Sequence, residues 1–322
     1  MRRLALSLIV SCAGVARPPE RPAIMPSPYR AREAAAVTLN ATCAGCHAEQ
    51  AEAWRGSMHR RAYDNAAFQA AVAVEPTPFC RGCHAPEANA SAPAIATELG
   101  VACVTCHVTR EGTVLAAPSS GARSGAPHSV TRSAAFASVA SCRSCHEFPF
   151  PGAPSLGEPH LMQTTMLEHA RSPAAERSCT TCHRSHSFSE VRDPAWLASQ
   201  LRVRAEVVRT PSANVARITL EQTAPGHAFP TGDLFRRLAV RVGSETRYLA
   251  RHFVGARELV RDDRVFDAPS VVTVSIPAGV NEVAWSVTLE RVAGIGSGFE
   301  PERATIESVV GLHAGVLAVE KD

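Results

Sequence analysis

The sequence predicts an α+β multidomain protein in which a loop-rich α-helical region is followed by an Ig-like antiparallel β-sandwich. Three features of its 322 residues predict this arrangement. Five C-x-x-C-H motifs lie between residues 43 and 183, separated by short helical and loop-like segments. From residue 201 onward, apolar side chains recur at every second position, which is the period of a strand with one buried face. No cysteine lies beyond Cys182, so the two regions differ in chemistry as well as in period.

The composition excludes several classes of protein. Charged residues make up 20% of the chain and the formal net charge is +3, which argues against a disordered polyelectrolyte and against a nucleic-acid binder. No apolar run approaches the length that spans a bilayer. We therefore expect a folded protein that does not bind nucleic acid and has no spanning helix.

The first 16 residues have the layout of a bacterial export signal. Arg2 and Arg3 precede a short apolar run, and small residues follow it. Cys12 is the one cysteine outside the motifs, and its setting resembles a lipoprotein signal, in which the cysteine is acylated and anchors the chain on a membrane. The alternative is cleavage after Ala16 without a lipid. Either way, we expect an exported protein, in the periplasm or, as a lipoprotein, at the outer membrane or cell surface.

Prolines are frequent in the next stretch, which shows no apolar period. Such a segment forms a stiff, extended tether and no packed element. The predicted organisation is therefore an export signal (1–16), a proline-rich tether (17–39), the motif region (40–195) and the β-sandwich (196–322).

The five motifs share one chemistry. In each of them, two thiols are spaced to reach the two vinyl groups at one edge of a porphyrin, and the next histidine can reach the iron. Zinc ribbons, disulfides and thioredoxin-like pairs also use C-x-x-C, but none of them requires a histidine after every second cysteine. We therefore expect five covalent c-type haems. Their attachment residues are Cys43, Cys46 and His47; Cys80, Cys83 and His84; Cys103, Cys106 and His107; Cys142, Cys145 and His146; and Cys179, Cys182 and His183.

Five haems in so short a region would replace much of the usual protein core. The aromatic content is only 5%, and porphyrin faces would supply the large flat apolar surfaces that aromatic side chains normally provide. Haems at this density must lie near one another, which allows electrons to pass between them.

Further histidines are candidates for the opposite, distal side of each iron. If every one of the five irons has two axial ligands from the protein, five more ligands are needed besides the motif histidines. His59 lies in a predicted helix that continues from the first motif, and His128 lies in a loop before the fourth. His186 follows His183 too closely to serve the other face of the same haem, so we expect it to reach a neighbouring one.

One more distal position has several candidates. His160, Met162 and His169 lie within one short segment, and a methionine ligand would raise the reduction potential relative to a histidine. We select His160, while the sequence leaves the other two open.

Several short elements in combination resemble a known family. They are Cys43 to His47 with Trp54 and Ser57-Met58-His59, Cys83-His84-Ala85-Pro86, Gly100 to Cys103, Met162 to Thr165, and Gly226 to Gly232. These elements resemble the multihaem c-type cytochromes related to the haem partner of hydroxylamine oxidoreductase, a group related to the pentahaem nitrite reductases. The resemblance covers about residues 40 to 240.

The resemblance implies stacked and perpendicular haem pairs, with distal roles for His59, His128, His186 and His227. In particular, the turn from Gly226 to Gly232 would project His227 back to the motif region as an axial ligand. The alternative is a structural turn whose histidine makes a core hydrogen bond. The chain departs from these relatives because it has no C-x-x-C-Lys site and has five motifs where hydroxylamine oxidases have eight.

The C-terminal region reads as short antiparallel strands. Alternating runs begin at Leu201, Ala216, Leu238, Val272 and Val283, and they are separated by Gly, Pro and Asn. This pattern predicts a sandwich of about seven strands that carries no haem of its own.

The sequence as a whole predicts an exported pentahaem cytochrome c and favours an electron carrier over an enzyme, with no catalytic residues assigned. It would pass electrons between a membrane or periplasmic donor and another redox protein or an extracellular acceptor. A first alternative is a reductase in which one open haem binds a small substrate such as nitrite or hydroxylamine. A second is a docking protein whose β-sandwich binds a surface partner and whose haems are cargo.

Overall fold

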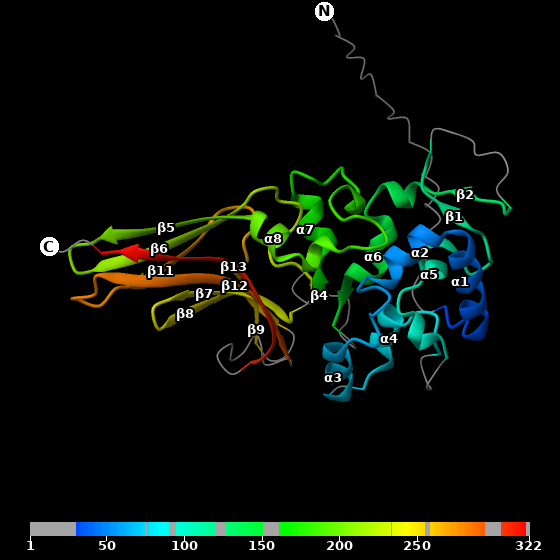
Figure 1. Cartoon of the computed structure of the whole chain (residues 1–322), viewed down its shortest axis with the longest axis horizontal. Coiled ribbons are helices and arrows are strands. Elements are labelled where there is room, and N and C mark those ends of the chain that lie inside the picture. The colour runs from blue at the N-terminus through cyan, green and yellow to red at the C-terminus, as the bar shows by residue number, and fades with distance from the viewer. Residues whose placement is uncertain are drawn as a thin grey trace, which may run out of the picture.

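The computed structural model describes residues 30–74, 76–89, 95–119, 127–150, 161–232, 234–254, 258–293 and 304–319. It is a mixed helix and strand protein with several antiparallel sheets, which confirms the predicted combination of helical and antiparallel strand structure. Figure 1 shows a helical region at one end of the long axis and a region of long strands at the other. Among the described residues, none of the helices is long and apolar enough to cross a membrane. The predicted export signal and Cys12 lie outside the described residues.

Short helices build the N-terminal region. They are α1 (Ala34–Cys46), α2 (Ala48–Arg55), α3 (Ala66–Val74), α4 (Pro78–His84), α5 (Cys103–His107), α6 (Ala140–His146), α7 (Thr165–Arg171) and α8 (Pro194–Ser199). Single 3₁₀ turns are η1 (Ile95–Leu99), η2 (Ala134–Ala137), η4 (Cys179–Thr181) and η5 (Glu190–Arg192). Two small sheets pair β1 (Leu115–Ala116) with β2 (Thr131–Arg132), and β3 (Glu147–Pro149) with β4 (Leu161–Thr164).

Each C-x-x-C-H motif coincides with a helical turn. Helices α4, α5 and α6 end at the histidine of their motif, α1 ends at Cys46, and η4 begins at Cys179. Residues three apart lie on one face of a helix, so the helical turn brings the two thiols of a motif to the same side. The helix predicted to reach His59 ends earlier, at Arg55, and His59 lies in the turn that follows.

The packed region begins before residue 39, the predicted end of the tether. Helix α1 begins at Ala34, and the side chain of Ala36 is fully buried. An ion pair that the proline pattern did not reveal joins this segment to the motif region. Arg32 donates to both carboxylate oxygens of Glu87, at 2.7 and 2.9 Å, and to the Val104 carbonyl at 2.8 Å. The other predicted boundary, between residues 195 and 196, falls within α8.

Two antiparallel sheets build the C-terminal region. One has the strand order β11-β6-β5 and the other β13-β12-β7-β8, and a separate hairpin pairs β9 with β10. The strands are β5 (Leu201–Arg209), β6 (Asn214–Gln222), β7 (Arg236–Val242), β8 (Glu245–Leu249), β9 (Arg251–Val254), β10 (Glu258–Asp262), β11 (Ser270–Ser275), β12 (Glu282–Ala293) and β13 (Thr305–Ala318).

The predicted alternation places one face of each sheet in a shared apolar core. Ile218 and Leu220 of β6 are fully buried, and so are Leu238 and Val240 of β7. All four belong to a single cluster to which both sheets contribute. Burial of this kind supplies about 1.5–3 kcal/mol for each large apolar side chain, so these strands have a core of their own.

Candidate functional site

One large cavity runs through the helical region. Its volume is about 3080 Å³, several times that of an ordinary small-molecule pocket of about 300–1,000 Å³. All ten motif cysteines line it, and all ten are free thiols. No group of three or more His, Cys, Asp or Glu side chains in the described part of the chain could hold a metal ion. In the described part of the chain, the motif thiols are therefore unbonded and line one shared space.

The cavity lining fits c-type haem. Thiols and histidines from the motifs provide attachment points, and the surrounding wall is largely alanine, valine, leucine and phenylalanine. Guanidinium groups that could pair with propionates also line the cavity. These arginines are Arg132, Arg177, Arg192, Arg236 and Arg291.

Four motif histidines face a second histidine across this cavity. The centroids of the facing rings are 6.4 Å apart for His47 and His128, 6.2 Å for His146 and His59, 6.2 Å for His107 and His186, and 6.0 Å for His183 and His227. Two imidazoles bound to one metal from opposite sides, each with a metal–nitrogen bond of about 2 Å, have centroids about 6 Å apart. The observed separations therefore suit two axial ligands of a single iron.

The ring pairs fall into two geometries. The planes of His183 and His227 differ by 2°, and those of His107 and His186 by 21°. The other two pairs are twisted, with interplanar angles of 58° and 71°. Each pair joins segments that are far apart in the chain, so the sequence alone could not assign which ring faces which.

The second motif is placed differently. The His84 ring stacks on Phe68 with centroids 3.9 Å apart, and its Nδ1 lies 2.7 Å from the Ala62 carbonyl. The predicted ligand His160 lies outside the described residues, so its distance from His84 stays untested.

Of the two further candidates from that segment, His169 is engaged elsewhere. Its Nδ1 lies 2.8 Å from the Gly226 carbonyl and its Nε2 lies 2.9 Å from the Arg177 carbonyl, so both ring nitrogens contact backbone oxygens. Met162 packs with Phe150 and other apolar side chains at the edge of the cavity.

Burial favours the neutral form of several of these histidines. It lowers the pKa of His146 to about 3, with the nearby His59 acting in the same direction. Burial also lowers the pKa of His59, His186 and His227. The pKa of His183 is lowered by burial as well, although Glu190 opposes the shift. A neutral imidazole is the form that binds a metal, so the site is set for ligation at neutral pH.

A buried carboxylate holds the loop that carries His227. Glu168 of α7 accepts hydrogen bonds from the Ala228 backbone N–H at 3.2 Å and the Thr231 hydroxyl at 2.9 Å. The guanidinium of Arg264, from the C-terminal region, donates to its other oxygen at 2.6 Å. The helical region thereby fixes the loop that brings a C-terminal histidine into the cavity.

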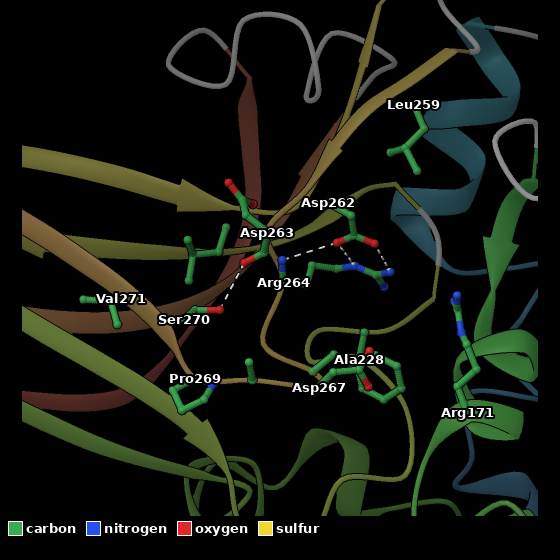
Figure 2. A pocket seen from close by; sticks show the side chains of 13 residues that line it. Arg171, Ala228, Leu259, Asp262, Asp263, Arg264, Asp267, Pro269, Ser270 and Val271 are labelled. Carbon is green, nitrogen blue, oxygen red and sulfur yellow. Dashed lines mark hydrogen bonds and ion pairs between the residues drawn. The ribbon is translucent and has the colours of Figure 1, made fainter.

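A second, smaller pocket lies in the C-terminal region (Figure 2) and has a volume of about 700 Å³. Asp262, Asp263 and Asp267 line it, but no cysteine or histidine does. Two of these carboxylates already have partners, because Arg264 donates to Asp262 at 2.6 Å and the Ala250 N–H donates to Asp263 at 2.7 Å. It therefore offers no attachment point for the haem chemistry of the motifs.

Comparison with known proteins gives two matches. A family model described as cytochrome c554 and c-prime matches residues 42–109, which contain the first three motifs. Among solved structures, a penta-heme cytochrome c552 from Thermochromatium tepidum is similar, with a TM-score of 0.63 and 17% sequence identity over 91% of this chain and 100% of that chain. No curated protein matches in sequence.

The structural likeness shows the fold, and the family match covers only part of the chain. Together with the motifs and their cavity, these findings support a multihaem c-type cytochrome with covalently bound haem that takes part in electron transfer.

Proposed function

We propose that this chain is an exported pentahaem cytochrome c that carries electrons between redox proteins. The observation that carries the proposal is the set of four facing histidine pairs beside C-x-x-C-H motifs. When bound, a haem supplies a one-electron Fe(III)/Fe(II) couple.

The chain's own residues would attach each haem and supply the ligands of its iron. The ten motif cysteines attach the porphyrins, and His47, His84, His107, His146 and His183 take the proximal positions. His128, His59, His186 and His227 take the distal positions at the first, fourth, third and fifth motifs, and His160 is the predicted fifth distal ligand. Two strong ligands keep the geometry of an iron nearly constant when its charge changes, which favours rapid transfer.

The ring pairs favour a carrier over a reductase. An iron held between two imidazoles has no position for nitrite or hydroxylamine, and four motifs have such a pair within reach, which confines the reductase alternative to the second motif. The relation to the haem partner of hydroxylamine oxidoreductase belongs to this proposal and is supported by the motifs that resemble that family.

The C-terminal region has a structural role in this proposal. It supplies His227 to the cavity and is tied to α7 through Arg264 and Glu168. We also propose that its sheets form an Ig-like sandwich, because strand orders β11-β6-β5 and β13-β12-β7-β8 share one core. A domain that only docks a partner would not contribute a side chain to the haem site.

Export through the signal predicted at residues 1–16 is also part of the proposal, with acylated Cys12 as membrane anchor. An exported carrier of this kind would accept electrons from a membrane or periplasmic donor and pass them to another redox protein or an extracellular acceptor. Intact-mass analysis of the mature protein tests the lipid, and a start at Arg17 without added mass contradicts it.

An electron paramagnetic resonance (EPR) spectrum of the oxidised, haem-loaded protein tests the site. We expect low-spin signals from the four paired sites, and we expect His227→Ala to convert one of them to a high-spin signal. His313→Ala is the matched control, because the His313 ring contacts the Ala198 carbonyl at 3.0 Å instead of a second histidine. An unchanged low-spin spectrum in His227→Ala would contradict the assignment of that ligand.

A further inference from the structure

The proximal histidines differ in what their second ring nitrogen contacts. A histidine bound to iron through Nε2 keeps its proton on Nδ1, and the acceptor of that proton changes the charge on the ligand. The Nδ1 of His107 lies 2.9 Å from the Leu115 carbonyl, and that of His84 lies 2.7 Å from the Ala62 carbonyl. Both acceptors are neutral.

The fourth motif also has a neutral partner. The Nδ1 of His146 lies 3.1 Å from the side-chain amide of Gln163. The amide atom that faces this ring is Nε2 of Gln163, so an iron-bound His146, which donates from Nδ1, requires the Gln163 amide to turn by half a rotation and accept through its oxygen.

The fifth motif has a carboxylate in the same position. The Nδ1 of His183 lies 3.5 Å from Oε1 of Glu190, a charge contact without a hydrogen bond, and the Glu190 side chain is only 2% exposed. The Arg184 backbone N–H donates to the same oxygen at 2.8 Å. The second oxygen, Oε2, is buried without a hydrogen-bond partner, and within the described ranges no arginine or lysine forms an ion pair with Glu190.

The other buried carboxylates near the cavity differ from Glu190 in this respect. Glu87 pairs with Arg32, Glu168 with Arg264, and Glu290 with Arg237. Their negative charges are balanced by a neighbouring guanidinium. Glu190 instead directs its charge at an axial ligand.

A negative charge at this place favours oxidised iron. Reduction adds one electron and lowers the charge of the iron by one, next to a carboxylate that water does not screen. This electrostatic effect lowers the reduction potential of the fifth site.

We propose that Glu190 sets the potential of the haem at the fifth motif and makes it the last of the five to be reduced. This inference rests on the proposed pentahaem function. Glu190 acts as a positioning and charge-setting residue through His183, without contact to the iron itself.

Potentiometric titration of the haem-loaded protein, followed by visible absorption and EPR, tests the inference. The low-spin signal that His227→Ala removes identifies the fifth site. Glu190→Gln keeps the shape of the side chain and removes its charge. At the midpoint potential of the wild-type fifth site, we expect the ratio of reduced to oxidised haem at this site to be about tenfold higher in the variant. This corresponds to a rise in midpoint potential of about 59 mV for a one-electron couple.

Two further variants serve as matched controls. Glu176→Gln removes the same charge from an exposed position near the fifth motif, where water screens it, and should leave the midpoint of the fifth site nearly unchanged. Gln163→Glu makes the reciprocal change at the fourth motif and should lower the midpoint of that site.

Several results would overturn the inference. These are an unmoved fifth-site midpoint in Glu190→Gln, an equal shift in Glu176→Gln, or a fifth site that is not the lowest in the wild type. If Glu190→Gln does not bind haem, the Gln163→Glu variant becomes the test. An unchanged midpoint potential at its fourth site would then overturn the inference. A wild type without covalent haem would instead refute the proposed function, so the two failures are distinguishable.

Discussion

The two regions of this molecule are stabilised in opposite ways. The strands from β5 to β13 enclose an apolar cluster built from their own side chains, such as Ile218 and Leu238. The helical region has only small clusters, such as that of Ala85, Ala88 and Ala96, and is otherwise hollowed by a cavity of about 3080 Å³. The difference teaches that one region folds around its own residues while the other is shaped around a cofactor.

Withholding haem should have the largest effect, and it should act on the helical region far more than on the strands. Expression without haem-attachment machinery should leave the helical region without a core, because its cavity would have to fill with water. We expect hydrogen exchange of the amides in 34–199 to approach that of an unfolded chain, while those in 201–319 stay protected. Equal protection of both regions in the haem-free chain would refute the distinction.

The next test concerns the buried ion pair of Glu168 and Arg264, which connects the two regions. Glu168→Ala removes the buried partner of Arg264 and should destabilise the haem-loaded protein by about 3 kcal/mol, since breaking a buried pair leaves a charge uncompensated. Urea unfolding measures the loss. Replacing the exposed Glu221, which pairs with Arg202, is the control and should cost less than about 1 kcal/mol.

Acid should weaken the same ion pair between Glu168 and Arg264. Burial alone would raise the pKa of Glu168, but Arg264 and the hydroxyls of Thr164 and Thr231 hold it below its ordinary value. A carboxyl with a depressed pKa in the folded state adds stability that is full above its unfolded pKa, about 4.3, and is lost as the pH falls through the folded pKa. Urea midpoints should therefore fall below about pH 4, and this dependence should be weaker in Glu168→Gln.

A conservative change in the strand core should have the smallest effect. Ile218→Val removes one buried methylene and should cost about 1 kcal/mol of unfolding free energy. The visible spectrum should stay unchanged, because the residue lies in the core shared by the sheets. A spectral change would show that the two regions are less independent than their cores suggest.

Much of the site could be predicted from the chain because its chemistry is local. Each C-x-x-C-H motif fits within one helical turn, and the sequence also selected His59, His128, His186 and His227 as side chains that meet a motif histidine. The alternation that begins at Leu201 likewise marks the strands, since period-two burial is a local property.

What could not be predicted depends on contacts between distant segments. The pairing of His59 with His146 needs the path of the chain, and Arg32 reaches Glu87 across tens of residues. Glu190 stood out in neither charge nor spacing, because its importance comes from the ring it faces. The alternating pattern also gave no sign of the β9–β10 hairpin, whose Arg251 donates to the Leu161 carbonyl.

The positions of the facing histidines along the chain also determine the order in which the sites are completed as the chain is made. Three of the four partner rings, His128, His186 and His227, follow their motif in the chain, and only His59 precedes the one it faces. A polypeptide that emerges from its N-terminus would thus carry attached but half-coordinated irons until later segments arrive, and closing such long loops is slow. The fifth motif would be the last to be completed, because its partner is made only after β6, so a nascent chain halted near residue 222 would be trapped with a reactive, open metal there.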